Sequence, residues 1–318
     1  MAGIFLLMYN ASNIKELKLL NKEATRKISV IIPTLNAEKY IPPLIDSLKK
    51  QTIPPDEIII IDSESDDRTA EIISGIEGVT LIQIKRKDFN HAITRDFAFR
   101  KSTGDYVIFI TQDAMPANEY FVERIIKPFT LDDGIAISTG RQIPRPDAWP
   151  FEKLVRNFNY PSMSRIRSAS DIPELGIKTF FTSDCCCAYR RDIYEKLGGF
   201  DFPVKTGEDL LFAAKTINAG YKIAYVPEAG VIHSHNLTLS QQYRRYFLAG
   251  YEIEKNKDIF CGVSHAKEGV KLVKYVSFEL LKQGHIFSFV HFGFDCIARL
   301  LGNRMGRRAY RKESKSVK

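Results

Sequence analysis

The sequence lacks the features that mark secreted, disulfide-bonded and membrane-spanning proteins. Among its 318 residues, no stretch reaches 18 apolar residues free of charge. The apolar run at residues 3–9 is too short for a bilayer and follows no basic region, so it makes a poor signal peptide. No CxxC pair is present, and three of the five cysteines are consecutive, at residues 185–187. We therefore expect buried, reduced cysteines and a cytoplasmic protein.

The phosphate-binding motifs of two large nucleotide-dependent classes are also missing. The motif GxxxxGK[ST] occurs nowhere, and no GxGxxG follows the first expected strand. These absences argue against a P-loop NTPase and against a dinucleotide-dependent dehydrogenase. The composition is that of a globular chain, with 44% hydrophobic and 26% charged residues.

The positive charge is concentrated at the C-terminus. The chain carries 46 Lys and Arg against 38 Asp and Glu, and residues 302–318 hold seven basic residues and one acidic residue. Just before them, apolar residues recur at helical spacing: Phe287, Val290, Phe294, Ile297 and Leu301. Because basic and aromatic residues are not interleaved across the chain, we expect no nucleic-acid partner. Residues 285–318 instead suit an anionic membrane surface, and a solvated basic tail is the alternative.

Short β-branched runs alternate with helical patterns from residue 28 onward. Strands are expected at residues 28–33, 57–62, 79–84 and 105–111, and helices at residues 38–51, from about residue 67, and at residues 91–101. Asn36 can cap the first helix, whose Pro42 and Pro43 are tolerated near its first turn. Continuous apolar strands separated by helices predict an α/β fold with a mostly parallel central sheet covered on both faces.

The pattern changes after residue 140. Residues 141–178 contain five prolines and the single tryptophan, which favours an ordered, irregular insertion over a site. Regular structure is expected again at residues 179–189, in helices near residues 191–197 and 208–219, and in a strand at residues 221–226. From about residue 236 the chain is expected to be mainly helical.

Polar residues directly follow three of the expected strands. The first strand ends in Pro33-Thr34-Leu35-Asn36, the second in Asp62-Ser-Glu-Ser-Asp-Asp67 and the fourth in Thr111-Gln112-Asp113. Ligands of open α/β sheets bind beyond the carboxyl ends of the strands, so we expect these residues on one rim. For Asp62 and Asp113 we favour a functional role, whereas Asp66 and Asp67 fit helix caps or turns equally well.

Together these segments resemble family 2 glycosyltransferases, which have the nucleotide-sugar-binding GT-A fold. The resemblance covers roughly residues 28–235 and rests on Val30-Ile-Ile-Pro-Thr-Leu-Asn36, Ile61-Asp-Ser-Glu-Ser-Asp-Asp67 and Gly207-Glu-Asp-Leu-Leu211. Three further motifs are similar to the rhamnosyltransferase branch: Phe89-Asn-His-Ala-Ile-Thr-Arg95, Thr111-Gln-Asp-Ala114 and His233-Ser-His-Asn-Leu-Thr238. We therefore expect an N-terminal extension (1–27), a GT-A domain (28–235) and a C-terminal helical region with a basic tail (236–318).

The resemblance implies a nucleotide-sugar site at the strand ends. It assigns donor binding to Pro33, Thr34, Asn36, Asp62, Ser63, Arg95, Gln112 and Asp113. Arg95 would donate to the diphosphate. A divalent cation, Mg²⁺ or Mn²⁺, would be held by Asp113 and by one of His233 and His235, of which we favour His235. The family usually carries Asp-x-Asp at the end of the fourth strand, and this chain departs from it with Thr111 at the first position.

The same resemblance places the chemistry at the start of the helix near residue 208. An inverting transfer needs one carboxylate that takes the proton of the acceptor hydroxyl. We assign this role to Asp209, with Glu208 binding the acceptor or orienting Asp209, and Asp184 as a weaker candidate. The alternative for Glu208 and Asp209 is that they only complement the helix dipole.

These residues predict an inverting glycosyltransferase acting in surface-polysaccharide synthesis, at the inner face of the membrane. By resemblance it moves L-rhamnose from dTDP-rhamnose to a glycan or lipid-linked acceptor. Two alternatives come from other classes. A sugar nucleotidyltransferase would need a glycine-rich loop after the first strand, and residues 33–37 contain no glycine. A non-catalytic membrane-surface binding module would use the basic C-terminus alone.

Overall fold

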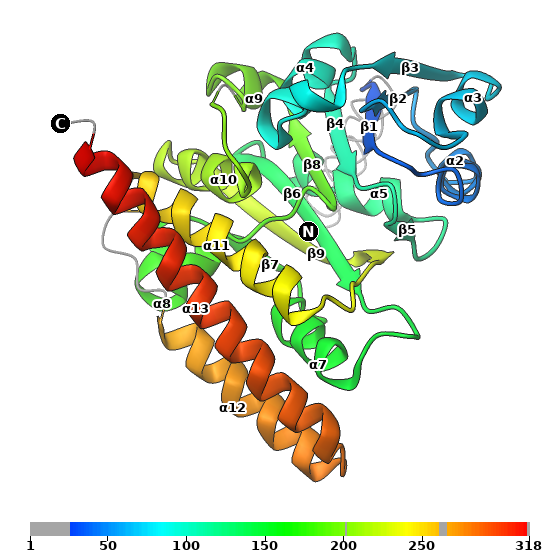
Figure 1. The fold of residues 1–318 in the computed structure, drawn as a ribbon. Coiled ribbons are helices and arrows are strands. Elements are labelled where there is room, and N and C mark those ends of the chain that lie inside the picture. Colours follow the sequence, from blue (N-terminus) through cyan, green and yellow to red (C-terminus); the bar gives the residue numbers. More distant parts are fainter. Residues whose placement is uncertain (1–25, 201, 261–265, 317–318) are drawn as a thin grey trace, which may run out of the picture.

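A computed structural model describes residues 26–200, 202–260 and 266–316, and within them nine strands form one sheet (Figure 1). The expected extension at residues 1–27 lies almost wholly outside this part of the chain. The order along the sheet is β3-β2-β1-β4-β8-β6-β9-β5, with β7 paired to β9. The strands are β1 (Ile28–Thr34), β2 (Glu57–Asp62), β3 (Val79–Gln83), β4 (Tyr106–Ile110), β5 (Met115–Pro116), β6 (Ile135–Ile143), β7 (Arg165–Arg167), β8 (Cys186–Arg190) and β9 (Lys222–Ile232).

The first four strands in sequence form a parallel set, because a helical segment connects each of them to the next. β1 pairs in parallel with both β2 and β4, and β2 with β3. β8 enters antiparallel to β4 and β6, whereas β6 and β9 are again parallel. The expected α/β fold with a mostly parallel central sheet is confirmed, and so are the four N-terminal strands to within one or two residues.

Helices cover both faces of the sheet. Alternate residues of β1 enter two separate apolar clusters, with Val30 and Ile32 on one face and Ile31 on the other. The helices before residue 236 are α2 (Ile41–Lys49), α3 (Thr69–Ser74), α4 (His91–Lys101), α5 (Phe121–Ile126), α6 (Pro128–Leu131), α7 (Pro150–Asn159), α8 (Ile172–Leu175), α9 (Arg191–Lys196) and α10 (Glu208–Asn218). Short 3₁₀ turns η1 (Arg86–Asp88), η2 (Ala169–Asp171) and η3 (Gly176–Phe180) join some of them.

Three local expectations were wrong. Asn36 does not cap the first helix: it has a left-handed backbone (φ 52°), its side chain accepts from the Asp66 N–H, and α2 begins only at Ile41. The segment 141–178 is less irregular than its prolines suggested, because Pro150 occupies the first turn of the ten-residue helix α7. Conversely, residues 176–180 form a 3₁₀ turn and the next strand begins at Cys186, not at residue 179.

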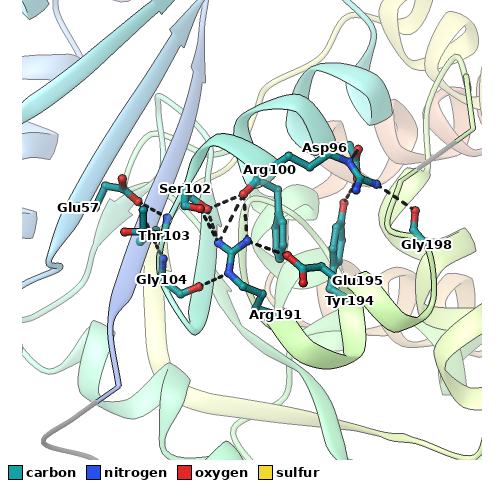
Figure 2. A network of polar contacts seen from close by, with 12 residues as sticks. Glu57, Asp96, Arg100, Ser102, Thr103, Gly104, Arg191, Tyr194, Glu195 and Gly198 are labelled. Carbon is teal, nitrogen blue, oxygen red and sulfur yellow. Dashed lines mark hydrogen bonds and ion pairs between the residues drawn. The ribbon is translucent and has the colours of Figure 1, made fainter.

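A polar network fixes α4 to α9 (Figure 2). Arg191, at the start of α9, donates to the carbonyl and the hydroxyl of Ser102 at 3.0 and 2.7 Å, just beyond the end of α4. Asp96 in the middle of α4 accepts from the Tyr194 hydroxyl at 3.0 Å. α4 also carries Arg95 toward the site described below, so this network fixes the helix from which Arg95 extends.

Beyond residue 236 the described chain is helical, as expected. It consists of α11 (Leu239–Lys255), η4 (Lys257–Phe260), α12 (Ala266–Lys282) and α13 (Ile286–Ser316). α12 and α13 lie side by side and extend past the sheet, as the orange and red helices of Figure 1 show. The basic residues expected as a tail continue α13 as far as Ser316. Within the described residues, no helix is long and apolar enough to cross a membrane.

The described cysteines are reduced, as expected. Cys185, Cys186 and Cys187 are free and buried at the start of β8, and Cys296 is free and half-buried on α13. The fifth cysteine, Cys261, lies outside the described residues. Cys185 and Cys186 pack in one apolar cluster and Cys187 in the other, so the triplet serves as small apolar side chains on both faces of the sheet.

Candidate active site

The ends of β1 and β2 meet at one edge of the sheet, where Asp62 is enclosed by hydroxyl groups. The carboxylate accepts from the Thr34 hydroxyl at 3.1 Å and from the Ser65 N–H at 3.0 Å, and also from the Ser65 hydroxyl. Asp62 is fully buried. The neighbouring Ser63 is buried as well, and its hydroxyl has no partner among the described residues. A ligand that supplied a partner to Ser63 would remove the cost of that unsatisfied group.

Hydrogen bonds join the loop after β1 to the segments that follow β4 and β2. Gln112, beyond β4, accepts from the Leu35 N–H at 2.8 Å and donates to the Leu35 carbonyl at 3.1 Å. Asn36 accepts from the Asp66 N–H at 2.8 Å. Pro33 lies within β1, paired with Ile61. The structure therefore brings Pro33, Thr34, Asn36, Asp62, Ser63 and Gln112 together along one edge.

A group able to hold a metal ion follows β4 and β9. Asp113 lies 3.5 Å from Nε2 of His233 and 3.4 Å from Nε2 of His235 through its two carboxylate oxygens. The ligand atoms of all three residues lie within 4.8 Å of one another. The expectation that only one histidine would face the metal was wrong. The two histidines follow β9, which ends at Ile232. Because residues two apart in an extended segment share a side, both imidazoles face Asp113.

The surroundings set the charge states of the two imidazoles differently. Burial and the neighbouring His233 lower the pKa of His235, which favours the neutral ring that a metal requires. Burial alone would lower the pKa of His233 too, but Cys185 and Asp113 outweigh it and raise that pKa. Nδ1 of His233 lies 3.1 Å from Oε1 of Gln142, and an N–H donated there leaves Nε2 as the ring nitrogen directed at Asp113.

Sequence reasoning missed the residues that support His233. Gln142, on β6, also accepts from Arg156 and donates to the Ser183 hydroxyl at 2.9 Å. Arg156 pairs with Glu152 one turn earlier on α7, at 2.7 Å, and both are buried. The only signal in the sequence was an oppositely charged pair at i,i+4, which is usual on any exposed helix.

The carboxylates at the start of α10 form a second group, together with the guanidinium of Arg95. Gly207 adopts a left-handed conformation (φ 81°) before Glu208 and Asp209. Arg95 lies 3.0 Å from Glu208 and 3.5 Å from Asp184. Asp209 accepts from the backbone N–H of Leu210 at 2.7 Å and of Asp184 at 3.3 Å.

These surroundings prepare Asp209 to accept a proton. Burial, reinforced by the negative charge of Glu208, raises the pKa of Asp209 from 3.8 to about 7. A carboxyl group with such a pKa is ionised enough to act as a base at neutral pH and basic enough to take a proton. Asp184 is more deeply buried, and burial raises its pKa well above its ordinary value. The arrangement therefore favours Asp209 over Asp184 as the group that exchanges a proton.

Arg95 does not lie with the other residues expected to bind the donor. Its side chain is only 6% exposed and ends between Glu208 and Asp184, while its Nη1 also donates to the His91 carbonyl at 3.1 Å. In this structure the guanidinium holds these two carboxylates in place, and its expected donation to the diphosphate stays a prediction. The sequence indicated a functional arginine here, but its partners come from β8 and α10, more than 80 residues away.

One cavity extends from the two histidines of the candidate metal site to the carboxylates at the start of α10. It has a volume of about 570 Å³, and its walls include His233, His235, Glu208 and Asp209. The C-terminal helices contribute Tyr246 and Arg299 among other lining residues, while α7 contributes Arg156 and Phe158. A molecule in this cavity would therefore touch both Asp209 and the imidazole groups, which is what a group transfer between two substrates requires.

Comparison with known proteins agrees with this geometry. Residues 29–198 match the sequence profile of glycosyl transferase family 2. The O-antigen chain rhamnosyltransferase RfbN of Salmonella typhimurium is 45% identical over 225 residues, which are 70% of this chain and 71% of that protein. The O-antigen chain rhamnosyltransferase WbaN of Salmonella anatum is 43% identical over 224 residues, 70% of each chain.

Solved structures show that the fold is of the GT-A type. The mannosyltransferase PcManGT from Pyrobaculum calidifontis, in complex with GDP-Man and Mn²⁺, aligns with a TM-score of 0.58 at 16% identity over 94% of this chain and 97% of that one. Glucosyl-3-phosphoglycerate synthase from Mycobacterium tuberculosis, in complex with Mn²⁺, UDP and glucosyl-3-phosphoglycerate, aligns with a TM-score of 0.54 at 22% identity over 78% and 84%.

Proposed function

This chain belongs to glycosyl transferase family 2 and is an inverting glycosyltransferase, and we propose from this premise that it transfers L-rhamnose from dTDP-rhamnose. The donor is suggested by the two rhamnosyltransferases that share 45% and 43% of aligned residues with it. The observation that carries the catalytic proposal is the position of Asp209, in the cavity that the two imidazoles also line, with its pKa raised to about 7.

The protein groups divide the reaction between them. Asp209 takes the proton of the acceptor hydroxyl as that oxygen attacks the anomeric carbon from the side opposite the diphosphate. Glu208 is paired with Arg95 at 3.0 Å, so it orients the start of α10 more readily than it binds a substrate. The Ser63 hydroxyl at the end of β2 supplies a hydrogen-bonding position for the nucleotide, in a pocket shaped by Thr34, Asp62 and Gln112.

The donor set of Asp113, His233 and His235 fits a divalent cation, and it fits Mn²⁺ better than Mg²⁺. One carboxylate and two imidazoles provide mixed oxygen and nitrogen ligands within 4.8 Å, whereas Mg²⁺ prefers oxygen ligands alone. Such an ion would neutralise charge on the departing diphosphate. Two imidazoles also compensate for Thr111, which stands where the family usually has the first aspartate.

The acceptor is proposed to be a glycan carried on a lipid, met at the inner face of the membrane by a cytoplasmic enzyme. Residues 28–235 would then form the catalytic unit, and residues 236–318 would complete the acceptor side of the cavity and contact an anionic membrane surface. The supporting observation is that Tyr246 and Arg299, from beyond residue 236, line the same cavity as Asp209.

A panel of nucleotide sugars tests the proposed donor. Each is incubated with the full chain and lipid extract as acceptor, with and without a chelator, and nucleoside diphosphate release and labelled lipid are measured. We expect dTDP-rhamnose to be used and the chelator to stop transfer, with Mn²⁺ restoring more activity than Mg²⁺. Use of another sugar, with dTDP-rhamnose inert, would refute the proposed donor.

Binding of dTDP tests the nucleotide position separately. Ser63→Ala should weaken dTDP binding by about tenfold, because one hydrogen bond to the ligand is lost, and should leave stability unchanged. Ser138→Ala is the matched control, since Ser138 is equally buried and its hydroxyl also has no partner among the described residues, but it lies on β6. Equal dTDP affinity of the two variants would contradict the assignment of Ser63.

A further inference from the structure

The α12–α13 hairpin exposes most of the large apolar side chains found on the described surface. Thirteen of the 25 large hydrophobic residues that are exposed belong to these two helices. Phe287, at the turn between them, is 95% exposed, and Phe278 on α12 is 65% exposed. So many exposed apolar side chains on two adjoining helices are unusual on a monomer and mark a surface that meets a partner.

α13 is oriented with Asp295 and two glycines buried and with a row of apolar side chains exposed. Asp295 is 1% exposed and accepts from Gln242 of α11 at 2.9 Å and from Arg299. Gly302 and Gly306 bring α13 against the α11 backbone, where an added Cβ would overlap it. The opposite side carries the stripe Phe287, Val290, Phe294, Ile297 and Leu301, all about half exposed or more.

α12 also exposes large apolar side chains. Val276 and Leu280 are buried in a cluster with Phe292 of α13 and with α7. Val270, Val273, Phe278 and Leu281 are exposed. The packing between α12, α13 and α7 therefore does not use these exposed side chains.

The stripe on α13 continues directly into positive charge. The spacing of three and four residues that links Phe294, Ile297 and Leu301 leads on to four exposed basic residues: Arg304, Arg308, Lys312 and Lys315. Arg307 and Arg311 instead pair with Glu254 of α11. One side of a single helix is thus apolar along its first half and cationic along its second.

Carboxylates of the two helices are engaged elsewhere. Within the described part of α12 and α13, Glu268 pairs with Lys178, Asp295 is buried, Glu313 accepts from Tyr251 and Glu279 accepts from Gln283. The exposed stripe therefore has no carboxylate positioned to neutralise its basic end.

We propose that this stripe docks on an anionic lipid surface, with the apolar side chains of the hairpin among the acyl chains and the basic end of α13 at the lipid phosphates. Both components strengthen such binding, because apolar burial and attraction to anionic headgroups add. A second copy of the chain is the less favourable occupant. Parallel pairing would oppose like charges, and antiparallel pairing would bury the cations against apolar residues.

The inference rests on the proposed function in one respect: docking would bring the cavity that Asp209 lines close to a lipid-linked acceptor. Leu272 of α12 and Arg299 of α13 line the same cavity as Asp209. The helices that carry the stripe therefore also form part of the cavity wall. A hairpin lying in the interface would place the opening of the site next to the membrane surface.

Vesicle sedimentation of the full chain tests the docking. The probe vesicles are phosphatidylcholine with about one third phosphatidylglycerol, compared with phosphatidylcholine alone. The variant F287Q/F294Q/I297Q should bind the anionic vesicles about tenfold more weakly or worse. The matched control L131Q/M163Q/I166Q changes three equally exposed apolar residues of the sheet domain and should bind as the wild type does.

Charge is tested in the same way. R304Q/R308Q/K312Q should lose the preference for anionic vesicles, while K50Q/K101Q/K127Q, which alters exposed lysines elsewhere, should retain it. Wild-type protein that fails to sediment with anionic vesicles overturns the proposal. So does a wild-type dimer in sedimentation velocity that F287Q/F294Q/I297Q converts to monomer, because it assigns the stripe to a second copy.

Binding of dTDP and thermal unfolding, measured on every variant, separate this inference from the proposed function. Variants that bind dTDP normally and unfold like the wild type, but do not sediment with vesicles, support docking by the stripe. Wild-type protein that binds dTDP but no vesicle refutes docking on the membrane and leaves the proposed transfer of rhamnose from dTDP-rhamnose intact. Vesicle binding without rhamnose transfer refutes the proposed donor alone.

Discussion

Replacing Asp209 by asparagine should stop transfer and at the same time stabilise the protein. Asparagine keeps the shape of the side chain but cannot take a proton, so the rate should fall by about 10² to 10⁴. The stabilisation follows from the pKa of Asp209, which burial raises from 3.8 to about 7. The ionised form that the reaction requires is therefore costly in the folded protein.

The magnitude follows from the difference between the two pKa values. At pH 8 the ionised Asp209 costs the folded state at most about 4 kcal/mol, at about 1.4 kcal/mol for each pKa unit. Asparagine cannot accept from both the Leu210 and the Asp184 N–H groups, which forfeits about 1 kcal/mol. Contact with water in the cavity reduces the gain further. We expect a net stabilisation of about 2 kcal/mol in urea unfolding.

The dependence on pH gives the sharper test. A folded-state pKa above the unfolded value means that the favourable contribution of Asp209 is complete below about pH 4 and is lost as the pH rises to about 7. The difference in stability between Asp209→Asn and the wild type should accordingly be small near pH 4 and full above pH 8. Wild-type activity should rise through pH 7. A difference independent of pH, or an active asparagine variant, would refute the reasoning.

The neighbouring carboxylate provides the control. Glu208→Gln removes the partner that lies 3.0 Å from the buried guanidinium of Arg95 and leaves it with Asp184 at 3.5 Å. Removing one member of a buried ion pair destabilises by about 3 kcal/mol. Two adjacent, nearly isosteric substitutions should therefore shift stability in opposite directions. Equal shifts would show that the two side chains are not distinguished in the way the structure describes.

Two further predictions concern helix packing and the metal. Gly306→Ala should destabilise by about 2 kcal/mol, because the added Cβ meets the backbone of α11, while Gly293→Ala on the open side of α13 should be neutral or stabilising by up to about 1 kcal/mol. Urea unfolding measures both, and equal stabilities would contradict the packing of α13 on α11. Asp113→Asn and His235→Ala should each weaken Mn²⁺ binding, followed by electron paramagnetic resonance, by roughly tenfold or more, whereas Asp66→Asn should not. Unchanged Mn²⁺ affinity in both variants would remove these residues from the metal site.

Local chemistry made the strands and their polar ends predictable. The runs before Thr34 and Asp62 are continuously apolar, so both faces of these strands must be buried. The carboxyl ends of parallel strands necessarily share an edge. Asn36 was misjudged because a residue that favours helix caps also favours a left-handed backbone, and the local sequence does not separate the two. α7 was obscured by prolines that interrupt a helix in its middle but suit its first turn.

Contacts between distant segments were beyond the reach of such rules. Arg95 was identified as functional, yet its partners Asp184 and Glu208 arrive from β8 and α10. The hydrogen bond between His233 and Gln142 joins residues 91 positions apart, and no sequence motif predicts it. The metal-binding expectation used only one histidine, although residues two apart in an extended segment share a side, so the sequence already placed the His233 and His235 side chains together.

The sequence by itself determined the α/β sheet, the edge where a nucleotide sugar can bind and the apolar and basic rows of the last helix. All of these follow from the order of residue types along one segment. The tertiary structure alone decided which side of α13 faces water. Periodicity shows which residues share a side of a helix. Which side of α13 is buried was decided by the close fit of Gly302 and Gly306 against the backbone of α11. That choice left the stripe exposed, because two backbones can approach closely only where no side chain intervenes.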